Sequence, residues 1–128
     1  MKMTLEEINK ECERMQEFLE ITASDDPDEL VQRLTEINVY LARSSKLLAD
    51  ARLLQSERIR KEVEDNMGTI RMLSATLAKK YIDALASEES HAVDWLDRLN
   101  RSFVHVGDNI RTQISFAKEQ LKLTRSGY

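Results

Sequence analysis

The stretch AVDWLDRLNRSFVHVGDNIRTQISFAKEQL, from Ala92 to Leu121, decides the fold of this chain. Its apolar residues follow one another at alternating steps of four and three, with one break at Gln113 and Ile114. This spacing predicts a long helix with an apolar seam of coiled-coil type along one face. The residues of the seam are Ala92, Leu96, Leu99, Phe103, Val106, Ile110, Ala117 and Leu121.

The composition of the whole chain also predicts helices. Only 3 glycines and 1 proline occur in 128 residues, and strong helix formers such as Leu, Ala, Glu and Lys dominate. Hydrophobic residues make up 41% and charged residues 33%, which suits one soluble domain with an apolar core. We therefore predict a single all-α domain, an elongated antiparallel bundle of three to four helices dominated by two long helices.

Local signals mark where the helices begin. Thr4 and Glu7 are spaced as a capping box, and Asp25 or Asp26 can cap a helix whose first turn contains Pro27. The sequence does not decide whether the third and fourth helices are continuous, because the apolar residues keep the same helical spacing across their boundary. The predicted segments are an acidic N-terminal helix at 1–23, a long helix at 27–65, a shorter helix at 69–86, a long helix at 87–122 and a frayed tail at 123–128.

The second of these segments has features that point to a close helical neighbour. A helix over 27–65 is a rod on the order of 55 Å long, which needs an antiparallel helix of similar length to cover it. Small residues in its middle would let that helix approach closely, or would fit against bulky Trp95 or Phe103. Asn66 and Gly68 predict the turn that follows, since both residue types tolerate the left-handed conformation that ends helices. The small residues are Ala42, Ser44, Ser45, Ala49 and Ala51.

Several features bear on where the chain works. No apolar stretch of signal-peptide length follows the N-terminal MKMTLEE, and no window approaches the roughly 18 uncharged apolar residues of a membrane span. One cysteine cannot form an internal disulfide. Cys12 falls in an apolar helical series with Ile8 and Met15, which predicts a packed thiol rather than a reactive one. We therefore expect a cytoplasmic location.

The charges are unevenly distributed along the chain. Residues 1–30 hold ten acidic and three basic side chains, whereas the rest of the chain holds thirteen acidic and sixteen basic. The segments 43–61 and 98–128 each hold six basic and two acidic side chains. Such blocks can meet an acidic partner or nucleic acid. We expect them instead to pair with the acidic N-terminal segment of the same or a neighbouring chain.

The motifs of common enzymes are missing from the sequence. The three glycines are too far apart for a phosphate loop, and neither GxSxG nor Cys-x-x-Cys occurs. Glu88 and His91 form one Glu-x-x-His motif, but a di-iron bundle needs two such motifs and further glutamates. A metal-dependent enzyme using Glu88, His91 and His105 is therefore a minor alternative, and we expect neither a metal nor a cofactor.

His105 has polar neighbours at helical spacing. Asp108 would orient its imidazole, and Arg111 would pair with Asp108, as in a hydrolytic site. Ser102 and Ser115 are candidates for the nucleophile only because they lie near His105 along the helix. We therefore favour a polar network at a helix interface over a catalytic site, and we expect the protein not to be an enzyme.

Two sets of surface residues are candidates for binding. The first is a polar row on the same helix as the seam, which we interpret as a site for a macromolecular partner. The second is a set of basic residues for nucleic acid, although the pI near 5.3 and the scarcity of aromatic residues argue against this use. The polar row consists of Arg98, Arg101, His105, Asp108, Arg111, Thr112, Ser115 and Lys118. The basic set consists of Arg43, Lys46, Arg52, Arg58, Arg60 and Lys61.

Two segments, LARSSKLLADAR at 41–52 and RLNRSFVHVGDNIRTQISFAKEQ at 98–120, carry a resemblance to a known group. The chain resembles small prophage-encoded helical proteins of unknown function, which have a similar LNR…H…LRT.ISY.K pattern near the C-terminus and neighbouring genes with recombination functions. The chain departs from this pattern at Gly107, which weakens a helix by about 1 kcal/mol. The residues that match the pattern are Leu99, Asn100, Arg101, His105, Arg111, Thr112, Ser115 and Lys118.

The resemblance implies a phage origin and an accessory role in a bacterial host cell, but no reaction. We therefore expect a non-catalytic helical interaction protein that binds a host protein or a phage DNA-metabolism protein. A DNA-binding recombination accessory protein is the alternative. A rod this thin would leave apolar surface uncovered, so we also expect a homodimer or higher homo-oligomer.

Overall fold

The protein is described by a computed structural model, which covers residues 2–22 and 24–125. These residues contain five helices and no strand, which confirms the predicted all-α class. The helices are α1 (Leu5–Glu20), α2 (Pro27–Asp65), α3 (Met67–Arg71), α4 (Ala75–Leu85) and α5 (Ser87–Arg125).

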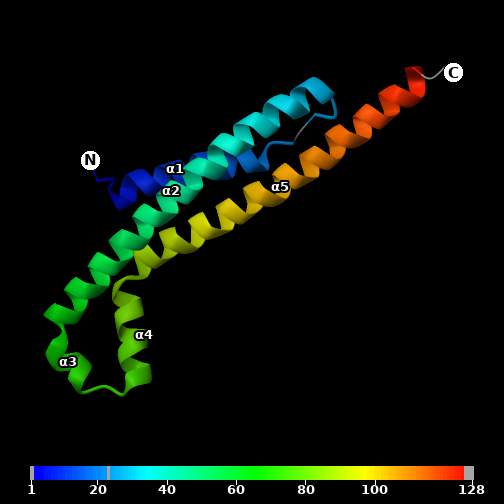
Figure 1. Ribbon diagram of the computed structural model, residues 1–128. Helices are drawn as coiled ribbons and strands as arrows, with labels where there is room; N and C mark the ends of the chain where they lie inside the picture. Colours follow the sequence, from blue (N-terminus) through cyan, green and yellow to red (C-terminus); the bar gives the residue numbers. More distant parts are fainter. Residues whose placement is uncertain (1, 23, 126–128) are drawn as a thin grey trace.

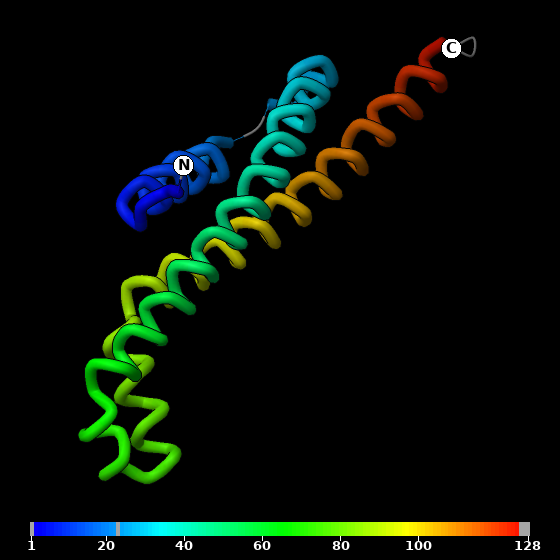
Figure 2. Tube along the Cα trace, turned by 60° about the vertical axis from the view of Figure 1, so that its left-hand side comes forward, coloured from blue at the N-terminus to red at the C-terminus, as the bar shows by residue number. Residues whose placement is uncertain are grey.

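The body of the molecule is a long antiparallel hairpin of α2 and α5, each of 39 residues (Figures 1 and 2). Helix α1 lies against the middle of this hairpin, and α3 and α4 connect the two long helices at one end. We call that end the connected end, and the end where α2 begins and α5 finishes the open end. The predicted elongated bundle dominated by two long helices is confirmed.

The first two helices begin at the predicted caps. The backbone N–H of Glu7 donates to the Thr4 hydroxyl at 3.2 Å, and the Glu7 carboxylate accepts from the Thr4 N–H at 3.0 Å. At the start of α2, the carboxylate of Asp26 accepts from the N–H of Glu29 at 3.3 Å, and Pro27 occupies the first turn. Each cap satisfies backbone donors that the helix itself leaves unpaired.

The register of the hairpin leaves part of α5 without a neighbour. The side-chain amide of Asn100 donates to the Ser44 hydroxyl at 3.0 Å, which fixes these residues opposite one another. Continuing that register along two antiparallel helices brings Pro27 roughly opposite Ala117. The last two turns of α5 therefore extend beyond the start of α2, as both views of the chain show (Figures 1 and 2).

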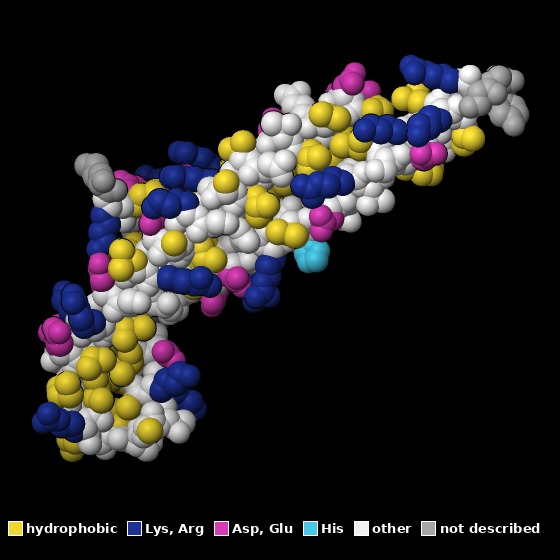
Figure 3. Space-filling model, viewed as in Figure 1, with side chains coloured by type: hydrophobic (Ala, Val, Ile, Leu, Met, Phe, Trp, Pro, Cys, Tyr) yellow, Lys and Arg dark blue, Asp and Glu magenta, His cyan; other side chains and the backbone are white. Residues whose placement is uncertain are grey.

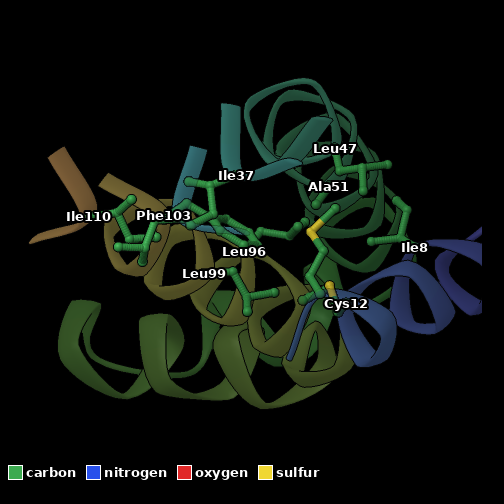
Figure 4. Packing of buried hydrophobic residues seen from close by; sticks show 12 residues of the cluster. Ile8, Cys12, Ile37, Leu47, Ala51, Leu96, Leu99, Phe103 and Ile110 are labelled. Carbon is green, nitrogen blue, oxygen red and sulfur yellow. The ribbon is translucent and has the colours of Figure 1, made fainter. Parts of the chain in front are cut away.

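The core is a single strip where α1, α2 and α5 meet (Figure 4). Helix α5 contributes most of the seam that its sequence predicts, and α1 covers the hairpin with one apolar face. The buried hydrophobic residues of this strip are Ile8, Cys12, Met15, Leu30, Ile37, Leu47, Ala51, Ala92, Leu96, Leu99, Phe103 and Ile110.

The residues of the predicted seam are less buried toward the open end of α5. Val106 and Ala117 are only half-buried, and Leu121 is 51% exposed. Leu121 is therefore not part of the core, because α2 does not extend far enough along α5 to cover it. The helical spacing of Leu121 is correct, but its expected neighbour is absent from the described part of the fold.

Three aromatic rings cluster at the centre of the core. Tyr40 stacks on Phe103 with ring centroids 5.5 Å apart, and Phe18 lies 4.8 Å from Tyr40. The guanidinium of Arg33 covers the Phe18 ring at 4.4 Å and donates to the carbonyls of Phe18 and Ile21, both at 3.1 Å. Arg33 thus binds the C-terminal end of α1, where a helix has unpaired carbonyls and a partial negative charge. Helix α1 ends at Glu20, earlier than predicted.

Cys12 is fully buried, as its apolar series predicts. Burial raises the pKa of the Cys12 thiol to about 11, and the neighbouring Glu11 and Glu13 carboxylates act in the same direction. The folded state therefore favours the protonated thiol. This contribution to stability is complete below the ordinary pKa of the thiol, 9.0, and is lost as the pH rises toward 11.

The native protein should accordingly resist thiol reagents at pH 8. We expect labelling of Cys12 by a disulfide reagent to be about a hundredfold slower in buffer than in denaturing urea, because the reactive thiolate is scarce and inaccessible. The measurement is the absorbance of the released thiolate over time. Equal rates in the two solutions would contradict the buried position.

The connected end differs most from the prediction. The expected helix over 69–86 is divided into α3 and α4, because the chain leaves the helix after Arg71 and the hydroxyl of Ser74 caps α4 by accepting from the Leu77 N–H at 3.3 Å. Asn66 ends α2 with φ −120°, so the expected left-handed residue is not used there. Gly68 lies inside α3.

The boundaries around α5 also change. Ala86 separates α4 from α5 and is fully buried, which answers the open question of continuity. Helix α5 continues to Arg125 rather than ending at 122, so residues 123–125 are helical and not a frayed tail. The remainder of the predicted tail, 126–128, lies outside the described residues, as do residues 1 and 23 of the predicted first segment.

The small residues of α2 divide into two groups. Ser44 and Ala51 are fully buried in the core, whereas Ala42, Ser45 and Ala49 are exposed. Trp95 does not occupy the space beside them, since its indole N–H donates to the Gln16 amide on α1 at 3.2 Å. The close approach of α5 therefore uses only the buried members of the group.

Candidate functional site

The polar row of α5 lies on the side of the helix that faces away from the core. All of its members are exposed, in contrast to the buried seam on the opposite side. Nothing in the core depends on their identity, so the row is available for contacts with another molecule. Its members are Arg98, Arg101, His105, Asp108, Arg111, Thr112, Ser115 and Lys118.

Short ion pairs hold two of the arginines in the row. Arg111 pairs with Asp108 at 3.0 Å, as the sequence predicts, and Arg101 pairs with Asp97 at 3.1 Å. Both pairs are within one turn of α5 and open to solvent, where such pairs are weak and exchange readily with a partner. Among the described contacts, no hydrogen bond joins His105 to Asp108.

The two serines near His105 do not complete a hydrolytic site. Ser102 is half-buried, Ser115 is exposed, and no hydrogen bond of the described residues joins either hydroxyl to the His105 ring. A nucleophile needs a base within hydrogen-bonding reach, and the arrangement lacks one. The geometry therefore offers hydrogen bonds and charge to a partner, and no assembled proton relay.

Glu88 and His91 occupy the first turns of α5 and are both exposed. The His91 ring lies beside Trp95, with centroids 5.7 Å apart. No group of three or more His, Cys, Asp or Glu side chains in residues 2–22 and 24–125 is arranged to hold a metal ion. His105 is exposed about four turns further along α5, and is not brought to Glu88.

The basic residues of α2 are largely engaged within the chain. Arg43 makes a two-pronged contact with the Glu11 carboxylate, with nitrogen–oxygen distances of 2.7 and 2.8 Å. This contact with Arg43 holds the pKa of the Glu11 carboxyl below its usual range. Lys46 pairs with Asp50 on the same helix at 2.7 Å. The expected pairing of this block with the acidic N-terminal segment thus occurs at Glu11.

The other basic residues of α2 lie toward its C-terminal half. Arg58 pairs with Glu62 at 3.0 Å, and Lys2 from the N-terminal segment pairs with Glu57. The remaining members of the basic set, Arg52, Arg60 and Lys61, are exposed. Half of the predicted nucleic-acid set therefore already has a carboxylate partner.

Asn100 has a role that the site prediction missed. Its amide nitrogen contacts the hydroxyls of Ser44 and Ser45 at 3.0 and 2.9 Å and the carbonyl of Leu41 at 3.4 Å. A polar group that bridges two packed helices fixes their register, because any shift leaves it unpaired. The small side chains of Ser44 and Ser45 could be identified in the sequence. Their contact with Asn100, which is 56 positions from Ser44, could not be predicted from it.

Gly107 is buried at the contact of α5 with α2 and causes no break in the helix. A Cβ at this position would lie 3.6 Å from Cγ2 of Ile37 and 3.9 Å from Cδ1 of Leu34, which are ordinary van der Waals distances. The close approach of α2 therefore does not require glycine here.

Comparison with known proteins adds no assignment. No protein-family model, curated protein or solved structure matches the chain significantly. The resemblance to prophage-encoded helical proteins therefore stays a prediction. None of the described helices combines the length and the hydropathy that crossing a membrane requires.

Proposed function

We propose that this chain is a non-catalytic interaction protein that binds a protein partner through the polar row of α5. The supporting observation is that all eight side chains of the row are exposed on a rigid helix whose other face builds the core. A rigid helix presents its side chains at fixed spacing, so binding orders few groups and costs little entropy. Arginine is also enriched at binding hot spots.

From the resemblance, we further propose that the chain is a phage accessory factor that acts in the bacterial cytoplasm. DNA binding is the alternative function, and it has less support. Three of the six basic residues on α2 pair with carboxylates, and the chain carries a net charge of −4. Binding to phosphate would have to displace those carboxylates, and it would weaken steeply with added salt.

Affinity capture with matched variants tests the proposal. Tagged wild-type protein, incubated with bacterial lysate from uninduced and phage-induced cells, should retain a partner at a defined stoichiometry. A variant with Arg98→Ala, Arg101→Ala, His105→Ala and Arg111→Ala should bind that partner at least about tenfold more weakly, because hot-spot side chains are lost. The binding constant is measured by calorimetry with the purified partner.

A control variant carries Lys79→Ala and Lys80→Ala on the exposed surface of α4 and should bind like the wild type. Equal binding by the row variant and the control would contradict the proposed site. Nuclease treatment of the lysate and a gel shift with duplex DNA at several salt concentrations address the alternative. Retention that depends on DNA would favour the recombination accessory role instead.

We also propose that the chain forms a homo-oligomer. Its surface of 9084 Å² exceeds the roughly 7,000 Å² expected of a compact monomer of 14.8 kDa. Part of this excess comes from large apolar side chains that are more than half exposed, among them Val39 and Phe116. Association of two chains would remove part of that surface from water.

A further inference from the structure

The connected end of the hairpin finishes in a turn whose apolar side chains face solvent. Helix α3 stops at Arg71 and the Ser74 hydroxyl caps α4, so the turn between them is the extremity of the rod at this end (Figure 1). Met72 in this turn is 87% exposed, and Leu77 in the first turn of α4 is 54% exposed. Neither α3 nor α4 contributes a buried side chain. We call residues 71–80 the tip.

The tip carries positive charge only. Arg71 directly precedes Met72, and Lys79 and Lys80 follow Leu77. All three cations are exposed, and none forms an ion pair with any other residue that the structure describes. No acidic residue occurs from 66 to 82, although the net charge of the chain is −4. Figure 3 shows apolar side chains gathered at this end, with basic side chains on either side of them.

The nearest carboxylates are set back from the turn. Asp65 ends α2 before α3 begins, and Asp83 is six residues beyond Leu77, which is about 9 Å along the axis of α4. The lysines are only about 3–5 Å beyond Leu77 on the same axis. Charges in water are screened over about 8 Å at physiological salt, so a surface that approaches the turn meets the positive charges first.

We propose that the tip binds the surface of an anionic lipid bilayer. Met72 and Leu77 enter the boundary between the headgroups and the acyl chains, and the three basic side chains contact the lipid phosphates. The contact is peripheral, with the rod standing on the bilayer by its connected end. This inference goes beyond the protein partner proposed above, because the polar row lies on α5 and takes no part in the contact.

The order of the side chains along the rod fits a lipid surface. Apolar side chains of interfacial segments enter the bilayer by about 5–10 Å. With Met72 and Leu77 at that depth, Lys79 and Lys80 can extend their long side chains back to the phosphates. Nucleic acid is bound mainly through its phosphate charges, and such a contact would leave the two apolar side chains in water. The apolar and basic side chains together therefore favour a bilayer.

The buried cysteine allows a specific test. In a Met72→Cys variant, an environment-sensitive fluorophore should react at the tip alone, because the Cys12 thiol is buried and protonated. Vesicles of phosphatidylcholine with about one-third phosphatidylglycerol should shift the emission to shorter wavelength. Vesicles of phosphatidylcholine alone should bind at least about tenfold more weakly, since each basic residue raises the affinity for an anionic surface about fivefold. The same label on a Val39→Cys variant should not respond, because Val39 is 64% exposed in α2, far from the tip.

Cosedimentation of unlabelled protein with the anionic vesicles separates the two contributions. Replacing the three basic residues of the tip with alanine should weaken binding by about tenfold or more. The row variant described above loses the same number of arginine or lysine charges from α5, and it should bind the vesicles like the wild type. Leu77→Glu should also weaken binding by about tenfold or more, because a carboxylate would enter the apolar boundary. Val39→Glu is its matched control and should have no effect.

Each variant should keep the circular dichroism of the wild type, because none of the substituted side chains is buried. A wild type that stays in solution with the anionic vesicles at low salt would overturn the inference. Equal binding by the tip variant and the row variant would do so too, since the attraction would then not be located at the tip. A label at position 72 that responds to duplex DNA and not to vesicles would assign the surface to nucleic acid instead. None of these results bears on the partner of the polar row.

Discussion

Replacing Phe103 with alanine should lower the free energy of unfolding by about 3–5 kcal/mol, because a fully buried aromatic side chain is lost and a cavity remains. Phe103 stacks on Tyr40 from α2 and lies 6.5 Å from the ring of Phe18 in α1. Its removal therefore loosens all three helices at once. A domain of this size has about 5–15 kcal/mol of stability in total, so the effect is a large share.

Urea unfolding followed by circular dichroism at 222 nm measures this effect. All proteins should be compared at one chain concentration, since a dimer is more stable at higher concentration. The neighbouring Val104→Ala variant is the control, because Val104 is 42% exposed on the other side of α5. Its loss should stay below about 0.5 kcal/mol. Similar losses for the two variants would contradict the described core.

The second large effect is expected at Ser44, a fully buried small side chain of α2 that contacts Asn100 of α5. Ser44→Leu should destabilise the protein by about 1–3 kcal/mol or more, because the added methylenes have no space between the helices. The substitution also removes a hydroxyl that accepts a hydrogen bond from Asn100 at 3.0 Å.

Ser45→Leu provides an unusually close control. Both hydroxyls donate to the Leu41 carbonyl at 3.0 Å and both accept from Asn100, but Ser45 is exposed whereas Ser44 is fully buried. The Ser45 variant should therefore lose less than about 1 kcal/mol, roughly the net value of one hydrogen bond. If the two variants unfold at the same urea concentration, burial at Ser44 does not set the helix separation.

The sequence predicted those parts of the fold that depend on neighbours along the chain. The cap at Thr4, the start of α2 at Pro27 and the buried positions from Ala92 to Ile110 all follow from local spacing. The division between α3 and α4 did not, because the apolar phase from Ile70 to Leu77 continues across it. The cap at Ser74 is a local signal that begins a new helix, although the apolar spacing continues across this point.

Features that depend on distant parts of the chain were less accessible. The spacing of Leu121 matches that of Leu96, yet only Leu96 is buried. The difference lies in where α2 begins, and that point is more than ninety residues away in the sequence. The ion pair of Glu11 with Arg43 was predicted only as a tendency of two charged segments. The polar row of α5 was predicted residue by residue, because an exposed helical face is fixed by the seam opposite to it.

The antiparallel hairpin has a consequence for the order of folding. Contacts near the connected end join residues that are close in sequence, such as Gln55 and Ser90, which are 35 positions apart. The contact of Ser44 with Asn100 spans 56 positions, and those at the open end span more. Closing a longer loop costs more entropy. The contacts of the hairpin should therefore form first at the connected end and then progressively toward the open end. The open end would then be the last region to form and the first to exchange its amide hydrogens.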